Sequence, residues 1–154
     1  MSGTLIWNSA LSWNSAFGTE INSLAAGSTA VSSVVIDNTT NLFTDGWVSC
    51  SLGTLATGTG APSLDFYLLP LNQDGTTYGD GTVSGTTVPS GAYYVGSITW
   101  NASLASGTRV GAIKLSPIIP PTKFVLAVVN NAGNALAASG NVIDYALDKF
   151  NLNG

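Results

Sequence analysis

The residues that could support acid–base chemistry in this chain are mostly aspartates. A glycoside hydrolase needs two carboxyl groups facing each other across a cleft, and Asp65, Asp74, Asp80 and Asp144 could supply them. Nothing in the sequence pairs any two of them, and Asp65 falls within an apolar run. The chain has no histidine, which excludes a Ser-His-Asp triad and an imidazole metal site. We therefore expect no enzymatic activity and no cofactor.

Two Asp-Gly dipeptides, at residues 74–75 and 80–81, are the candidates for a calcium loop. Such a loop places several oxygen ligands at close spacing and ends with a glutamate. Here the two aspartates are six residues apart, and the sole glutamate, Glu20, lies upstream of both. Asp-Gly is also a common turn dipeptide. The spacing therefore predicts turns and no metal site.

The composition excludes further classes of protein. The single cysteine, Cys50, cannot form an intramolecular disulfide, and we expect it to be a small core residue. Four basic residues are too few to follow a phosphate backbone, so we expect no nucleic-acid partner. No apolar run reaches the length of a membrane span, and residues 1–7 lack the pattern of a signal peptide. We expect synthesis in the cytoplasm and no membrane partner.

Charged residues make up only 8% of the chain, against about 25% in an ordinary soluble domain. So few charges give little electrostatic protection against self-association. This composition would suit a protein that functions as part of an assembly. A surface rich in hydroxyl and amide groups that is soluble without charges is an equally good interpretation.

The chain pattern is typical of short β-strands separated by turns rich in Gly, Asn, Asp and Pro. This spacing predicts an all-β, antiparallel two-sheet sandwich of about eight strands. A jelly roll is our first expectation, and an immunoglobulin-like sandwich is the alternative. The expected strands are residues 31–36, 42–55, 64–71, 92–100, 108–115, 123–129 and 141–152, with a weaker candidate at 19–24.

We expect two parts: an N-terminal arm at residues 1–18 and a sandwich domain at residues 19–154. The arm contains a near repeat, WNSA at 7–10 and again at 13–16. Trp7 and Trp13 either dock onto a neighbouring molecule or pack back onto the core of this domain. Residues 72–91 form an unusually long connection, and such loops are often binding elements.

Exposed aromatic side chains are the basis of a third hypothesis, a saccharide platform. Aromatic residues in strands belong more often to the core than to a platform. The candidates are Tyr67, Tyr78, Tyr93, Tyr94 and Trp100.

Several turn-and-strand segments together resemble the capsid decoration, or cement, proteins of tailed bacteriophages. They are residues 36–41 (IDNTTN), 66–70 (FYLLP), 120–124 (PPTKF), 130–133 (NNAG) and 138–141 (ASGN), with Asp74-Gly75 and Tyr78. The resemblance covers the chain from about Thr19 onward. It implies a small jelly-roll protein that binds the outside of an expanded icosahedral shell.

This resemblance implies a virion protein on the outer capsid surface that bridges neighbouring capsid subunits and stabilises the shell. Its partners would be the major capsid protein and neighbouring copies of itself, as a dimer or trimer. The expected capsid or subunit contacts are Trp7, Trp13, Asp74, Tyr78 and Asp80. A component of a phage tail or fibre and a saccharide-binding β-sandwich module remain the alternatives.

Overall fold

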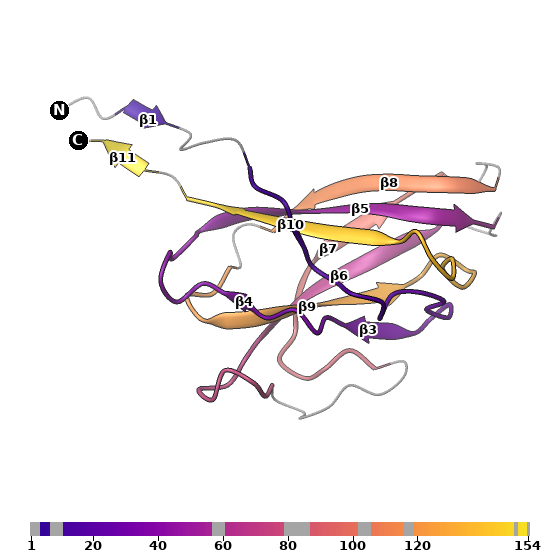
Figure 1. Ribbon diagram of the computed structural model, residues 1–154, viewed down its shortest axis with the longest axis horizontal. Helices are drawn as coiled ribbons and strands as arrows, with labels where there is room; N and C mark the ends of the chain where they lie inside the picture. The colour runs from indigo at the N-terminus through magenta and orange to yellow at the C-terminus, as the bar shows by residue number, and fades with distance from the viewer. Residues whose placement is uncertain are drawn as a thin grey trace.

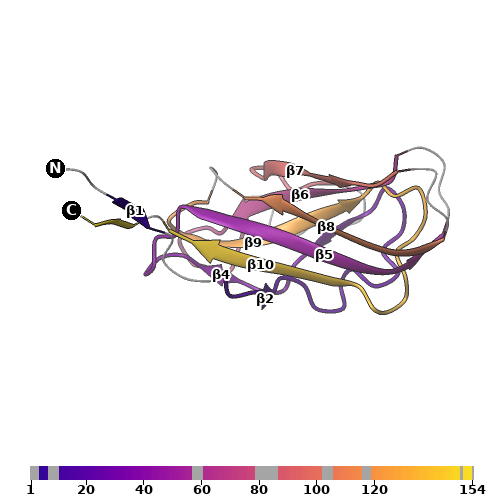
Figure 2. The same ribbon diagram turned by 90° about the horizontal axis from the view of Figure 1, so that it is seen from above.

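Two antiparallel sheets packed face to face form the body of the protein (Figures 1 and 2). The computed structural model describes residues 4–6, 11–56, 61–78, 87–101, 106–115, 119–149 and 151–153, with the backbone alone at 4–6 and 151–153. All the regular structure in these residues is β-strand. The all-β prediction is therefore confirmed.

The first sheet has four strands in the order β2-β10-β5-β8. The strand bounds are β2 (Asn14–Ser15), β10 (Val142–Asp148), β5 (Asp45–Leu55) and β8 (Gly107–Lys114). Along β5, buried residues at 48, 50 and 52 alternate with more accessible ones, as expected where one face of a sheet is covered.

The second sheet has five strands, with β9 at its centre. β3 (Thr29–Val31) and β4 (Ile36–Asp37) both pair with β9 (Lys123–Asn130), followed by β6 (Ser63–Pro70) and β7 (Tyr93–Thr99). β9 and β6 are buried on both faces for part of their length, which explains their nearly continuous apolar runs.

The pairing follows a nested order that identifies a jelly roll. β6 pairs with β7, β5 with β8, β3 and β4 with β9, and β2 with β10, so each strand from the first half meets its counterpart from the second half. A long antiparallel hairpin that is rolled up gives this order, because its two arms remain paired as they wrap into two sheets. The expected jelly-roll topology is confirmed over the immunoglobulin-like alternative.

The core lies between the inner faces of the two sheets. Phe66 and Leu68 from β6 and Phe124 from β9 are fully buried, as are Val48 from β5 and Ile143 from β10. Cys50 also belongs to this core, as predicted. Burial raises the pKa of its thiol to about 12, so it stays protonated and unreactive.

Two strand predictions were wrong in detail. The run at residues 31–36 is interrupted: Ser32 turns inward, and its hydroxyl donates a hydrogen bond to the carbonyl oxygen of Ala16. Residues 19–24 form turns instead of a strand, with Asn22 N donating to Thr19 O and Ser23 at φ 56°. Residues 19–24 bond locally and lie outside the sheet ladder. Ser32 N still donates to Leu126 O of β9, and the strand is interrupted after it until β4 begins at Ile36.

The N-terminal segment joins the sandwich before residue 18. Asn14 and Ser15 pair with Tyr145 and Asp144 of β10, and Ala16 and Phe17 are buried in the core. Any part of the chain that projects as an arm therefore lies N-terminal to residue 14.

The two chain ends form a separate ribbon. β1 (Thr4–Ile6) pairs antiparallel with β11 (Asn151–Asn153), so the nested order of the roll continues outward to this pair. Figures 1 and 2 show this ribbon extending away from one end of the sandwich. The expected strand at 141–152 is accordingly divided into β10 and β11.

Candidate functional site

The candidate site is the end of the sandwich from which the β1–β11 ribbon emerges, which we call the terminal end. It consists of residues 37–45, 71–78, 119–123 and 148–149, together with Lys114 at the end of β8. Most of the charged side chains in the described part of the chain gather here: Asp37, Asp45, Asp74, Lys114, Lys123, Asp148 and Lys149.

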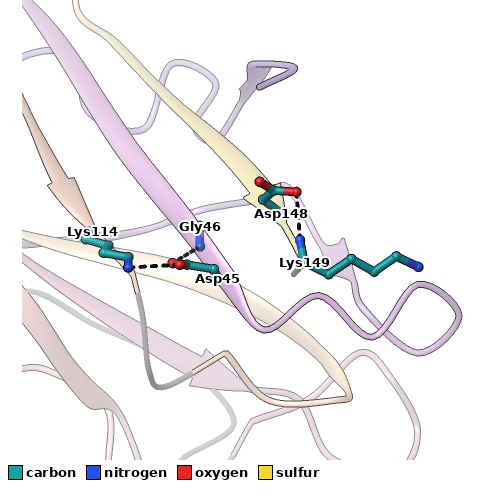
Figure 3. A network of polar contacts seen from close by, with 5 residues as sticks. All are labelled: Asp45, Gly46, Lys114, Asp148 and Lys149. Atoms are coloured by element: carbon teal, nitrogen blue, oxygen red, sulfur yellow. Dashed lines mark hydrogen bonds and ion pairs between the residues drawn. The ribbon is translucent and has the colours of Figure 1, made fainter. Parts of the chain in front are cut away.

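Asp45 and Lys114 form the most buried ion pair of this end (Figure 3). Lys114 Nζ lies 2.9 Å from Asp45 Oδ2, and the side chains of Asp45 and Lys114 are 4% and 46% exposed. Gly46 N donates to Asp45 Oδ1 at 2.8 Å. A buried carboxylate requires such partners because its desolvation is costly.

Asp148 faces Asp45 directly across the β5–β10 pair. Its Oδ1 accepts a hydrogen bond from Lys149 N at 2.8 Å, while the Lys149 side chain extends away from the network (Figure 3). Like charges directly opposite each other on neighbouring strands are unfavourable. Here Asp45 is paired with Lys114, and Asp148 is bonded to the Lys149 backbone.

Asn38 connects two loops of the terminal end. It is fully buried. Its Nδ2 donates to the carbonyl oxygens of Phe43 and Pro120, both at 2.9 Å, and its Oδ1 accepts from Phe43 N at 2.7 Å. Asn38 therefore fixes residues 38–43 against residues 120–122. Sequence reasoning missed this role, since the partners are 5 and 82 positions away.

Asp74 holds the first turn of the long connection. Its Oδ1 accepts from Thr76 N at 2.8 Å and Thr77 N at 2.9 Å, and its Oδ2 accepts from the Thr77 hydroxyl at 2.5 Å. These donors lower the pKa of Asp74 to about 2. The predicted turn role of Asp74-Gly75 is thus confirmed, with Gly75 at φ 68°. Asp80 lies outside the described residues.

A hollow of about 470 Å³ lies beside this turn. Thr39, Asn72, Gln73 and Thr122 contribute hydroxyl and amide groups to its lining, and Lys123 is its basic residue. Lys123 Nζ lies 3.6 Å from Asp37 Oδ2. Asp37 lines a second, smaller hollow of about 240 Å³ together with Asn14 and Tyr145. The ion pair therefore joins the two hollows of this end.

Tyr78 and Trp13 differ in their surroundings. Tyr78 is half-buried and packs against a small cluster on the outer face of the second sheet, formed by Leu69, Leu71, Val125 and Ala127. It anchors the long connection to the sheet.

Trp13 is 45% exposed beside the start of β2, between Ser12 and Asn14, which line the smaller hollow. Trp7, the other tryptophan of the repeat, lies outside the described residues.

Of the carboxylates considered for hydrolysis, the three that the structure describes are not brought together. Asp65 is on β6 in the second sheet, Asp144 is on β10 in the first sheet, and Asp74 is at the terminal end. Among the described residues, no three His, Cys, Asp or Glu side chains are grouped to hold a metal. Nor do these residues include a helix long and apolar enough to cross a membrane.

Comparison with models of protein families and with curated proteins gives no match for this chain.

Proposed function

We propose that the protein is a non-enzymatic virion component that decorates and stabilises an icosahedral bacteriophage capsid by bridging neighbouring capsid subunits. In this proposal the terminal end docks on the shell. The observation that carries the proposal is the gathering of ion pairs and the β1–β11 ribbon at one end of an otherwise sparsely charged jelly roll. The exposed Trp13 lies between Ser12 and Asn14, which line a hollow together with Asp37 of this end.

The charge distribution supports docking through this end. Charged groups at an interface mainly set partner choice and register, and an exposed aromatic side chain supplies contact area. Lys123 and Lys149 offer positive groups, and Asp37 and Asp148 offer negative ones. The terminal end can therefore complement a partner surface that carries charges of both signs.

The β1–β11 ribbon supports a role in bridging. An isolated pair of strands is marginally stable in water, and each strand of this ribbon is only three residues long. A neighbouring sheet edge would stabilise the ribbon by adding a third strand. A clamp of this kind stabilises the closed shell because it binds the assembled form and not the free subunits. Many copies acting together need only modest individual affinity.

The test is co-sedimentation of the purified chain with expanded, empty capsids of the tailed phage that encodes it. We expect saturable binding to expanded shells. Replacing both Trp7 and Trp13 with Ala should lower the occupancy. Val142→Ala is the matched control, because Val142 is 47% exposed on β10 and lies away from the terminal end. Absence of binding by the unaltered chain would contradict the proposal, and unchanged occupancy of the double variant would contradict the role of the tryptophans.

Light scattering of the free protein across a concentration series tests its self-association. A stable dimer or trimer would support a clamp that sits on a symmetry axis. A strict monomer would favour self-association only on the shell, or a monovalent binding module.

A further inference from the structure

Two tyrosines face each other on the outer surface of the second sheet, away from the terminal end's ion pairs. Tyr67 on β6 and Tyr94 on β7 are direct partners in register. Their ring centroids are 5.4 Å apart with an interplanar angle of 60°, an edge-to-face arrangement. Tyr94 is 52% exposed, so much of its ring is available to a ligand.

A polar network adjoins the Tyr94 ring. The hydroxyl groups of Tyr94 and Ser97 lie 2.7 Å apart, and the Ser97 hydroxyl donates to Asp65 Oδ1. Asn131 Nδ2 donates to Asp65 Oδ2 at 2.7 Å. Asp65 is thereby held in place by neutral donors and forms no ion pair with any described residue.

The strand geometry orients these side chains. The register of β6 and β7 shifts between Phe66 and Tyr67, with Gly96 opposite Phe66 and Tyr94 opposite Tyr67. Such a bulge increases local twist and redirects side chains, and bulges are frequent beside binding sites. Here the bulge leaves Tyr94 on the same face as Asp65 and Ser97, because opposed residues of an antiparallel pair share a face.

We propose that Tyr67, Tyr94, Asp65 and Asn131 form a binding subsite for a neutral pyranose saccharide. The apolar face of the sugar ring would lie on Tyr94. An ionised carboxylate has about four acceptor positions. In this network each carboxylate oxygen of Asp65 accepts one hydrogen bond. The remaining positions accept from two adjacent sugar hydroxyls. Because the carboxylate has no basic partner among the described residues, the site disfavours acidic sugars. This proposal does not depend on capsid docking.

The test is native affinity electrophoresis in gels that contain a soluble polysaccharide. The neutral probes are dextran, galactomannan and xyloglucan, and the acidic probes are polygalacturonate and hyaluronate. We expect at least one neutral polymer to retard the protein and neither acidic polymer to do so. Tyr94→Ala should weaken the retarding interaction about tenfold, equivalent to the loss of one aromatic contact. Asp65→Asn should weaken it as well, because one acceptor oxygen is lost.

Tyr93→Ala is the matched control. Tyr93 is 51% exposed, adjacent in sequence to Tyr94, and opposite Leu68, whose side chain faces the core. It therefore points away from the subsite, and we expect Tyr93→Ala to keep full retardation. Thermal unfolding of each variant separates misfolding from loss of binding. The proposal is overturned if no neutral polymer retards the unaltered protein, or if folded Tyr94→Ala and Tyr93→Ala proteins behave alike.

Discussion

Asp45 is buried at the start of β5, and its carboxylate lies 2.9 Å from the half-exposed ammonium group of Lys114 at the end of β8. Asp148 faces Asp45 from the other neighbouring strand. The ion pair thus joins two strands of the first sheet at the terminal end.

Replacing Lys114 with Met should lower the free energy of unfolding by about 1–2 kcal/mol, as measured by urea denaturation. Removing one partner of a buried pair costs about 3–5 kcal/mol, and solvent screening at the exposed lysine reduces this. Lys149→Met is the matched control, because it removes a positive charge from the same end without breaking an ion pair between described residues. Equal effects of the two substitutions would show that the Asp45–Lys114 contact is not the cause.

Asn38→Ala should destabilise the protein more strongly, by about 3 kcal/mol. The change leaves two carbonyl oxygens and one backbone N–H without their side-chain partner, and unsatisfied buried polar groups cost about 1–3 kcal/mol each. Asn41→Ala, an exposed change in the same loop, should shift stability by less than about 0.5 kcal/mol. Urea denaturation again provides the measurement, and a loss below about 1 kcal/mol for Asn38→Ala would argue against its connecting role.

Gly53 on β5 leaves no room for a side chain. An added Cβ would lie 2.5 Å from the carbonyl oxygen of Ser139 and 2.8 Å from Ala137 Cβ. The nearest atom is a backbone oxygen, which cannot move aside as a flexible side chain can. Gly53→Ala should therefore lower the free energy of unfolding by about 1–3 kcal/mol. Gly18→Ala meets only the flexible end of Glu20, at 3.0 Å, and should have a smaller effect. Comparable thermal unfolding midpoints for the two variants would contradict this close approach.

The Asp74 turn should loosen in acid. Its carboxyl pKa falls from an ordinary value of 3.8 to about 2 in the folded protein, because Thr77 and Thr76 donate to the charged form. A lowered pKa in the folded state means that the stabilisation is complete above the unfolded value and is lost as pH falls through 3.8 toward 2.

The measurement is an NMR titration of the Asp74 carboxyl group with the amide signals of Thr76 and Thr77. We expect the amide signals to change together with the carboxyl group below pH 3.8. In Asp74→Asn this transition should be absent. A carboxyl group titrating at its ordinary value would contradict the proposed hydrogen bonding.

The amino-acid sequence alone determined the long β-strands of the two sheets. The apolar patterns at 64–71, 92–100, 108–115 and 123–129 correspond to β6, β7, β8 and β9 within one residue at each end. These patterns are local: the period of two residues per repeat records which side of each strand is covered. The Asp74 turn was predictable for the same reason, since its partners lie within three positions.

The tertiary structure decided how the strands pair and which side chains meet. No local pattern states that β2 pairs with β10 or that the run at 31–36 is interrupted where Ser32 bonds to Ala16. The Asp45–Lys114 ion pair and the subsite of Asp65, Tyr94 and Asn131 likewise join residues from distant parts of the chain. Such contacts form only when the roll closes, because the nested pairing brings the first half of the chain against the second. The sequence of each strand contains its apolar pattern, whereas the packing of the two sheets selects the strand with which it pairs.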